Sequence, residues 1–127
     1  MPRPKPTRYR VFAILNAIRH IELVVRDIDE QIFSTDFRPY RIVERELEII
    51  SEASRHLTEA QKARFPEIPW RRIADIGNVL RHLYDDVAPS LLWEVVVRDL
   101  AALKAVAEKL YAEVKRPADP WPDAEPK

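Results

Sequence analysis

The chain has 127 residues, of which 46% are hydrophobic and 33% charged, with one glycine and no cysteine. This length fits one domain with one core, the single glycine leaves little turn chemistry for β-hairpins, and the lack of cysteine excludes disulfides, thiolate metal sites and a cysteine nucleophile. Lys and Arg (21) balance Asp and Glu (21), so no overall charge draws the molecule onto nucleic acid, and any RNA contact must come from a local patch.

Residues 1–9 form a proline-rich arm with basic residues and no acidic one. Its composition is typical of a disordered, solubilising tail, although it could also offer a basic patch. The arm lacks the apolar core of a signal peptide, and no apolar run approaches the roughly 20 residues of a membrane span. We therefore expect a cytoplasmic protein that makes no membrane contact.

Apolar residues spaced three and four apart predict the first two long helices. The first runs over residues 10–28, and the second over about 37–56, with Asp36 directly before it. Thr58 and Gln61 then have the spacing of a capping box, which predicts a short extra helix over residues 59–65.

Pro69 suits the first position of a third long helix, which the apolar pattern carries to Val87. A fourth helix follows over residues 89–114, and the proline-rich segment 116–127 should be a disordered tail in which Trp121 is the one candidate anchor. These elements predict an all-α fold for residues 10–115, an up-and-down four-helix bundle with an extra short helix.

The end of the third predicted helix gathers side chains that can act on a phosphodiester: Asn78, Arg81, His82 and Tyr84. An imidazole titrates near neutral pH, a guanidinium is a fixed cation, and a phenol can carry a proton. The alternative is an ordinary helix end, in which Arg81 and His82 pair with carboxylates four residues further on and suit the helix dipole.

Other chemistries have less support in the sequence. No phosphate-binding loop, dinucleotide-binding glycine pattern or His-Glu-x-x-His motif is present. The three histidines, His20, His56 and His82, are far apart and lack neighbours at the spacing of metal ligands, so we expect no metal and no cofactor. The second helix also carries a pattern typical of a solvated salt-bridge face: Glu44, Glu48 and Glu52 at i,i+4 spacing, with Arg41, Arg45 and Arg55 nearby.

Several motifs, in order, resemble the HepT-like family of helical ribonuclease toxins. They are Leu47-Glu48-Ile49-Ile50-Ser51-Glu52-Ala53, the run from Pro66 to Ile73, the run from Gly77 to Tyr84, Leu92-Trp93-Glu94-Val95-Val96, and Asp99-Leu100-Ala101-Ala102-Leu103. The resemblance covers about residues 10–112. It implies a homodimeric bundle that acts as a metal-independent endoribonuclease, with RNA as substrate.

The resemblance also implies a partner, a minimal nucleotidyltransferase antitoxin that transfers AMP onto Tyr84, the tyrosine of the His-x-Tyr motif. Within such a site, His82 would be the general acid or base, Arg81 would stabilise the phosphorane, and Asn78 would orient the imidazole or hold a phosphate. Tyr84 or a second copy of His82 would carry the other proton.

One position departs from the family pattern. The family pattern has an arginine separated from the histidine by four to six residues, where this chain has Gly77, Ile76 and Asp75. An arginine can bind a phosphodiester with two parallel hydrogen bonds, which a neutral residue does not reproduce. The alternative hypothesis is therefore a catalytically weak helical subunit that binds a nucleotidyltransferase partner and presents itself for modification.

Overall fold

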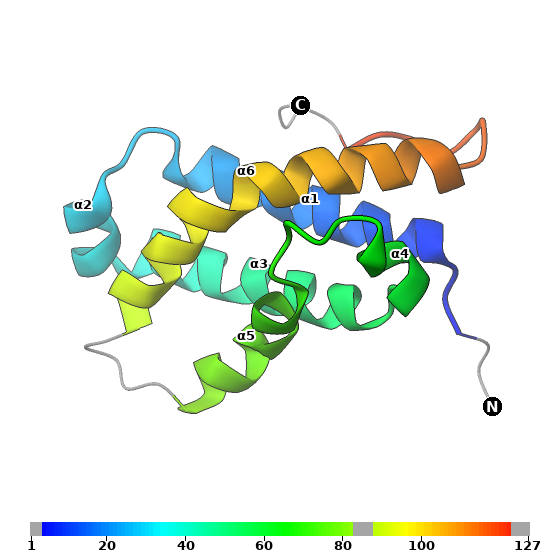
Figure 1. The fold of residues 1–127 in the computed structure, drawn as a ribbon. Helices are drawn as coiled ribbons and strands as arrows, with labels where there is room; N and C mark the ends of the chain where they lie inside the picture. The colour runs from blue at the N-terminus through cyan, green and yellow to red at the C-terminus, as the bar shows by residue number, and fades with distance from the viewer. Residues whose placement is uncertain (1–3, 83–87, 123–127) are drawn as a thin grey trace.

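The computed structural model describes residues 4–82 and 88–122 (Figure 1). Within them the chain forms six helices and no strand: α1 (Thr7–Val25), α2 (Glu30–Thr35), α3 (Phe37–Arg55), α4 (Glu59–Ala63), α5 (Trp70–His82) and α6 (Ala88–Val114). The four long helices correspond to those that the apolar pattern predicts, so the all-α helical bundle is confirmed. Helix α1 lies three residues earlier than the predicted range 10–28, and the predicted end of the third long helix, at Val87, lies outside the described residues. None of the described helices has the combined length and apolarity that crossing a membrane requires.

The long helices pack in a defined order. Helix α3 lies between α1 and α5, and α6 packs mainly against α1, with α3 and α6 running opposite to α1 (Figure 1). The core between them is built from the predicted apolar stripes, which include Ile14, Ile18, Leu47, Ile50 and Leu103, each at most 1% exposed. Because each stripe repeats every three or four residues, one face of each helix removes its apolar side chains from water.

The short helix α2 was not predicted from the sequence. Asp29 caps it by accepting a hydrogen bond from the Ile32 backbone N–H at 2.9 Å, and Phe33 is fully buried beside the rings of Tyr40 and Trp93. Six residues are too few to display a helical stripe, so the helix depends on this cap and on one aromatic anchor.

Caps set the starts of α3 and α4. Asp36 accepts a hydrogen bond from the Arg38 backbone N–H at 3.0 Å and two more from its guanidinium, and the Arg38 hydrogen bonds hold the pKa of Asp36 below its usual value. Thr58 and Gln61 form the predicted capping box, with reciprocal hydrogen bonds of 3.0 and 2.9 Å. The helix it starts ends at Ala63, two residues before the predicted end.

The carboxyl-terminal segment folds back after α6. The buried Tyr111 hydroxyl donates a 2.6 Å hydrogen bond to the Pro120 carbonyl, and the ring of Trp121 packs edge-on against the Tyr111 ring, with centroids 5.0 Å apart. Burial raises the pKa of Tyr111. Arg8 of α1 also lies 3.4 Å from Asp119, so the segment is attached to both α1 and α6.

Candidate functional site

Helix α5 carries the predicted site, and its first turn is fixed to α4 and to the loop that follows α4. The Trp70 indole N–H donates hydrogen bonds to the carbonyls of Lys62 and Phe65, at 3.1 and 3.0 Å. Ile73 and Ile76 are buried against the core, at 2% and 6% exposure. The amino-terminal half of α5 is therefore packed, whereas its last turn carries the exposed polar residues.

The structure places three of the four predicted site residues on that last turn. Asn78, Arg81 and His82 are all exposed, and Asn78 and His82 share one face because they are four residues apart. No side-chain hydrogen bond or ion pair joins any of the three to another residue within 4–82 or 88–122. Tyr84, together with the carboxylates that could pair with Arg81 and His82, lies outside the described residues.

Gly77 lies where α5 crosses α3. The Ser51 hydroxyl on α3 donates a 2.8 Å hydrogen bond to the Ala74 carbonyl and accepts one of 3.2 Å from the Gly77 N–H. Arg55 donates two further hydrogen bonds to the same Ala74 carbonyl, from Nε at 2.9 Å and Nη2 at 2.6 Å. Buried Ser51 and the Arg55 guanidinium therefore fix the position of α5 on α3.

A groove of about 180 Å³ opens along this crossing. It is lined by four charged side chains of α3, by Ser51, and by two residues of α5: Arg45, Glu48, Glu52, Arg55, Gly77 and Arg81. A Cβ placed on Gly77 would lie 3.8 Å from Arg81 Nη1, so the Arg81 side chain extends back over Gly77 into the groove. This direction agrees with the general tilt of helical side chains towards the amino terminus.

The groove was not predicted, although its α3 residues were singled out as a salt-bridge face. That interpretation describes part of it, since Arg45 lies 3.6 Å from Glu48 and Glu52 lies 3.1 Å from His56. The available sequence signal was Ser51, a small uncharged residue among these charges, and the structure shows that it is buried where this face meets another helix. Which helix it meets depends on tertiary packing.

A second contact connects α5 with α6. Arg72 Nη2 lies 2.6 Å from Asp99 Oδ1, and Asp99 is only 7% exposed. Arg98 lies 3.6 Å from the same oxygen, while Asp99 Oδ2 is buried without a hydrogen bond among the described atoms. This pair connects the site helix to the far side of the bundle.

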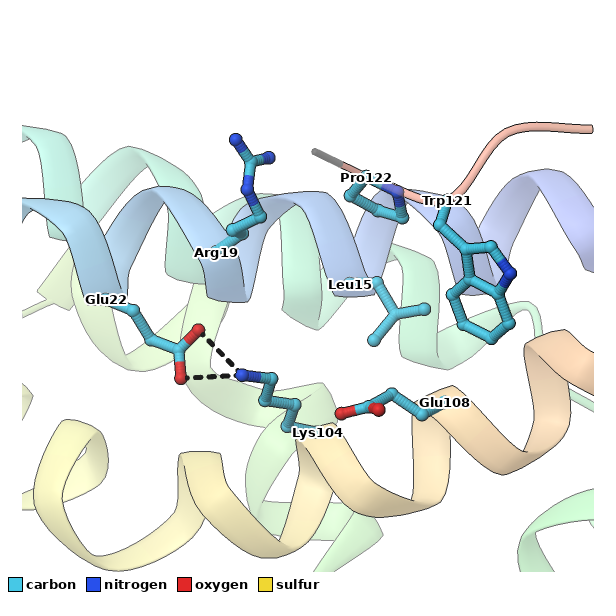
Figure 2. Close-up of a pocket in the computed structure, with 7 residues that line it drawn as sticks. All are labelled: Leu15, Arg19, Glu22, Lys104, Glu108, Trp121 and Pro122. Atoms are coloured by element: carbon cyan, nitrogen blue, oxygen red, sulfur yellow. Dashed lines mark hydrogen bonds and ion pairs between the residues drawn. The ribbon is translucent and has the colours of Figure 1, made fainter. Parts of the chain in front are cut away.

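A larger cavity of about 270 Å³ lies between α1, α6 and the carboxyl-terminal segment, away from the predicted site residues (Figure 2). Lys104 spans it with two 3.1 Å contacts to the Glu22 carboxylate, and Trp121 closes one end. In the part of the chain that the structure describes, no three His, Asp or Glu side chains gather as a metal site would require.

Comparison with known proteins gives this geometry its context. The family model "Ribonuclease HepT-like" matches residues 14–110. This range covers most of the chain and includes all four predicted site residues. The chain belongs to the HepT-like ribonuclease family. Its resemblance to that family, inferred from the spaced motifs, is thereby confirmed.

Several proteins of other organisms are similar to this chain. A probable ribonuclease HepT of Thermococcus cleftensis is 40% identical over 76% of this chain and 88% of its own length. MJ1380 of Methanocaldococcus jannaschii, whose name marks it as a candidate RNase, is 32% identical over 77% of this chain and 90% of its own. TTE0752 of Caldanaerobacter subterraneus, named in the same way, is 32% identical over 70% and 80%. No solved structure matches the chain.

Proposed function

We propose that this member of the family is a metal-independent endoribonuclease that acts as the toxin of a toxin-antitoxin pair. The observation that carries the proposal is the exposed last turn of α5, where Asn78, Arg81 and His82 lie within five residues in a chain of a ribonuclease family. An exposed imidazole with no side-chain partner among the described residues is available to exchange protons with a substrate.

In the proposed reaction, His82 removes the proton of a ribose 2′-hydroxyl, and the resulting oxygen attacks the adjacent phosphorus. The bond from phosphorus to the 5′-oxygen breaks, that oxygen takes up a proton, and a cyclic phosphate remains on the other fragment. Arg81 offsets the charge that develops on the phosphorane, and Asn78 orients the imidazole or holds a phosphate oxygen. The second proton carrier is Tyr84 or the His82 of a second copy in a homodimer.

Silencing is proposed to occur through Tyr84. Its phenol oxygen attacks the α-phosphate of ATP on a minimal nucleotidyltransferase partner, so that pyrophosphate leaves and AMP stays on the tyrosine. Because Tyr84 is only two residues from His82 in the sequence, the added anion would repel an RNA phosphate and block access to the imidazole.

The test is cleavage of total cellular RNA by purified protein in the presence of a chelator, after intact mass has excluded AMP on Tyr84. His82→Ala should abolish cleavage, whereas His56→Ala should retain it, because His56 is an exposed histidine at the end of α3 that already pairs with Glu52. Equal cleavage by both variants would contradict the assignment and point to a contaminating nuclease.

A second function is favoured by Gly77, which stands where the family pattern has an arginine. The chain would then be a catalytically weak helical subunit that binds the nucleotidyltransferase and presents Tyr84. Unmodified, folded wild type that cuts no RNA but gains the mass of AMP in the presence of a nucleotidyltransferase and ATP would establish this function in place of the first.

A further inference from the structure

The proposed reaction at His82 leaves open how the RNA is held. The groove between α3 and α5 has the side chains to hold it. Three arginines line it, Arg45 and Arg55 from α3 and Arg81 from α5, against two carboxylates, Glu48 and Glu52. Arg81 immediately precedes His82, so the groove reaches the proposed site within one helical turn, about 5.4 Å along the axis.

The three guanidinium groups differ in how far they are already engaged. Arg55 uses Nε and Nη2 on the Ala74 carbonyl, which fixes its plane and leaves Nη1 without a hydrogen bond among the described residues. Arg81 makes no side-chain hydrogen bond or ion pair within the described part of the chain. Arg45 is 72% exposed and lies 3.6 Å from Glu48. Donors therefore remain for an anion.

Gly77 makes room for this arrangement. It lies opposite the buried Ser51, and the Arg81 side chain passes over the place where a larger side chain at position 77 would stand. A side chain no larger than alanine at position 77 leaves the Arg81 guanidinium its place in the groove, because even an added Cβ would lie 3.8 Å from Arg81 Nη1, an ordinary van der Waals distance.

We propose that the Arg45–Arg55–Arg81 groove binds a backbone phosphate of single-stranded RNA adjacent to the nucleotide that is cut at His82. Arg55 and Arg45 hold this phosphate through charge-assisted hydrogen bonds, and Arg81 lies between it and the scissile phosphate, so that its charge acts on both. The carboxylates of Glu48 and Glu52 limit the affinity, Glu48 by competing for Arg45. This inference rests on the proposed ribonuclease function and adds the place where the strand is held.

The test is a binding measurement that needs no catalysis. A fluorescein-labelled 2′-O-methyl oligoribonucleotide, which has no free 2′-hydroxyl to attack the phosphate, is titrated with wild type, Arg81→Gln and Arg71→Gln, and anisotropy is followed at several salt concentrations. Arg71 is the matched control, since it is an exposed arginine of α5 with no side-chain partner in the described ranges, and it lies outside the groove.

Arg81→Gln should bind the RNA about tenfold more weakly than wild type, and its salt dependence should fall by about 0.7 in log-log slope, the value for one lost phosphate contact with a single strand. Arg71→Gln should stay within about twofold of wild type. If the two variants lose equal affinity for RNA, the loss reflects only the change in net charge, and the proposal is overturned. It is also overturned if wild type does not bind the oligonucleotide.

A gain of affinity provides the sharper test, because misfolding does not produce it. Glu48→Gln should bind the RNA several-fold more tightly, since it frees Arg45 and removes a negative charge from the groove. The matched control is Glu59→Gln, which removes a 94% exposed carboxylate that also faces a basic residue three positions away. If Glu59→Gln improves binding as much as Glu48→Gln does, the groove has no special part in RNA binding.

Binding and cleavage separate this inference from the function on which it rests. If wild type cuts RNA in a manner that requires His82, but Arg81→Gln and Arg71→Gln bind equally well, the ribonuclease function stands and the groove is refuted. If the oligonucleotide binds as described but wild type cuts no RNA, the groove stands and the catalytic assignment fails.

Discussion

Replacing Gly77 with alanine should make the protein more stable. Gly77 is the one glycine of the chain and lies inside α5 with no positive φ, so alanine fits its backbone conformation without strain. A glycine there leaves the unfolded chain more conformational freedom to lose on folding than alanine does. The substitution therefore acts chiefly on the unfolded state.

The size of the effect follows from the surroundings of the added methyl group. Its nearest neighbours would be Ser51 Oγ at 3.5 Å and Arg81 Nη1 at 3.8 Å, which are ordinary van der Waals distances. No contact opposes the helix-propensity gain of about 1 kcal/mol. With an unfolding entropy of about 2.1 cal/mol/K for each of 127 residues, roughly 0.27 kcal/mol/K in all, the midpoint of thermal unfolding should rise by about 4 °C.

The assay is thermal unfolding followed by circular dichroism at about 222 nm, the helical band, with guanidinium unfolding as an independent measure of the free energy. Gly77→Leu is the informative companion, because a large side chain would displace the Arg81 guanidinium from the groove. An alanine variant that melts below wild type would refute the reasoning, since it would mean that α3 and α5 approach too closely at this crossing for any side chain.

Three other changes test the packing of the fold. Arg72→Ala should lower the free energy of unfolding by about 2 kcal/mol in urea denaturation, because it leaves the Asp99 carboxylate buried without its nearest cation, and half exposure of the arginine moderates the loss. Tyr111→Phe should cost about 1 kcal/mol and speed proteolysis of the carboxyl-terminal segment, because the hydrogen bond to that segment is lost. Asp36→Ala should lower the melting temperature near about pH 7 and have little effect near about pH 2: Arg38 depresses the pKa of this carboxyl, so its contribution is present above the unfolded pKa and disappears as pH falls through the folded pKa. A melting difference that persists unchanged in acid would contradict this account.

Some features of the fold could be predicted because they depend on residues that are close together in the sequence. The long helices follow from apolar spacing, and α4 follows from the Thr58 capping box, whose two hydrogen bonds are present. Helix α2 could not be predicted in this way, since its stability depends on Phe33 meeting two aromatic rings from other helices. Its capping residue, Asp29, can be seen in the sequence, but an aspartate alone is not sufficient evidence for a helix.

The sequence by itself determined the helical class, the family and the position of Asn78, Arg81 and His82 on one helix end, because helical periodicity and motif spacing are properties of neighbouring residues. Only the tertiary structure decided that Arg81 lies over Gly77 and shares a groove with Arg55, a residue more than twenty positions earlier in the chain. That meeting depends on the crossing of α5 over α3, which buried Ser51 and the apolar core fix together. Local sequence patterns specify on which face of a helix a residue lies, and tertiary packing specifies which other helix that face contacts.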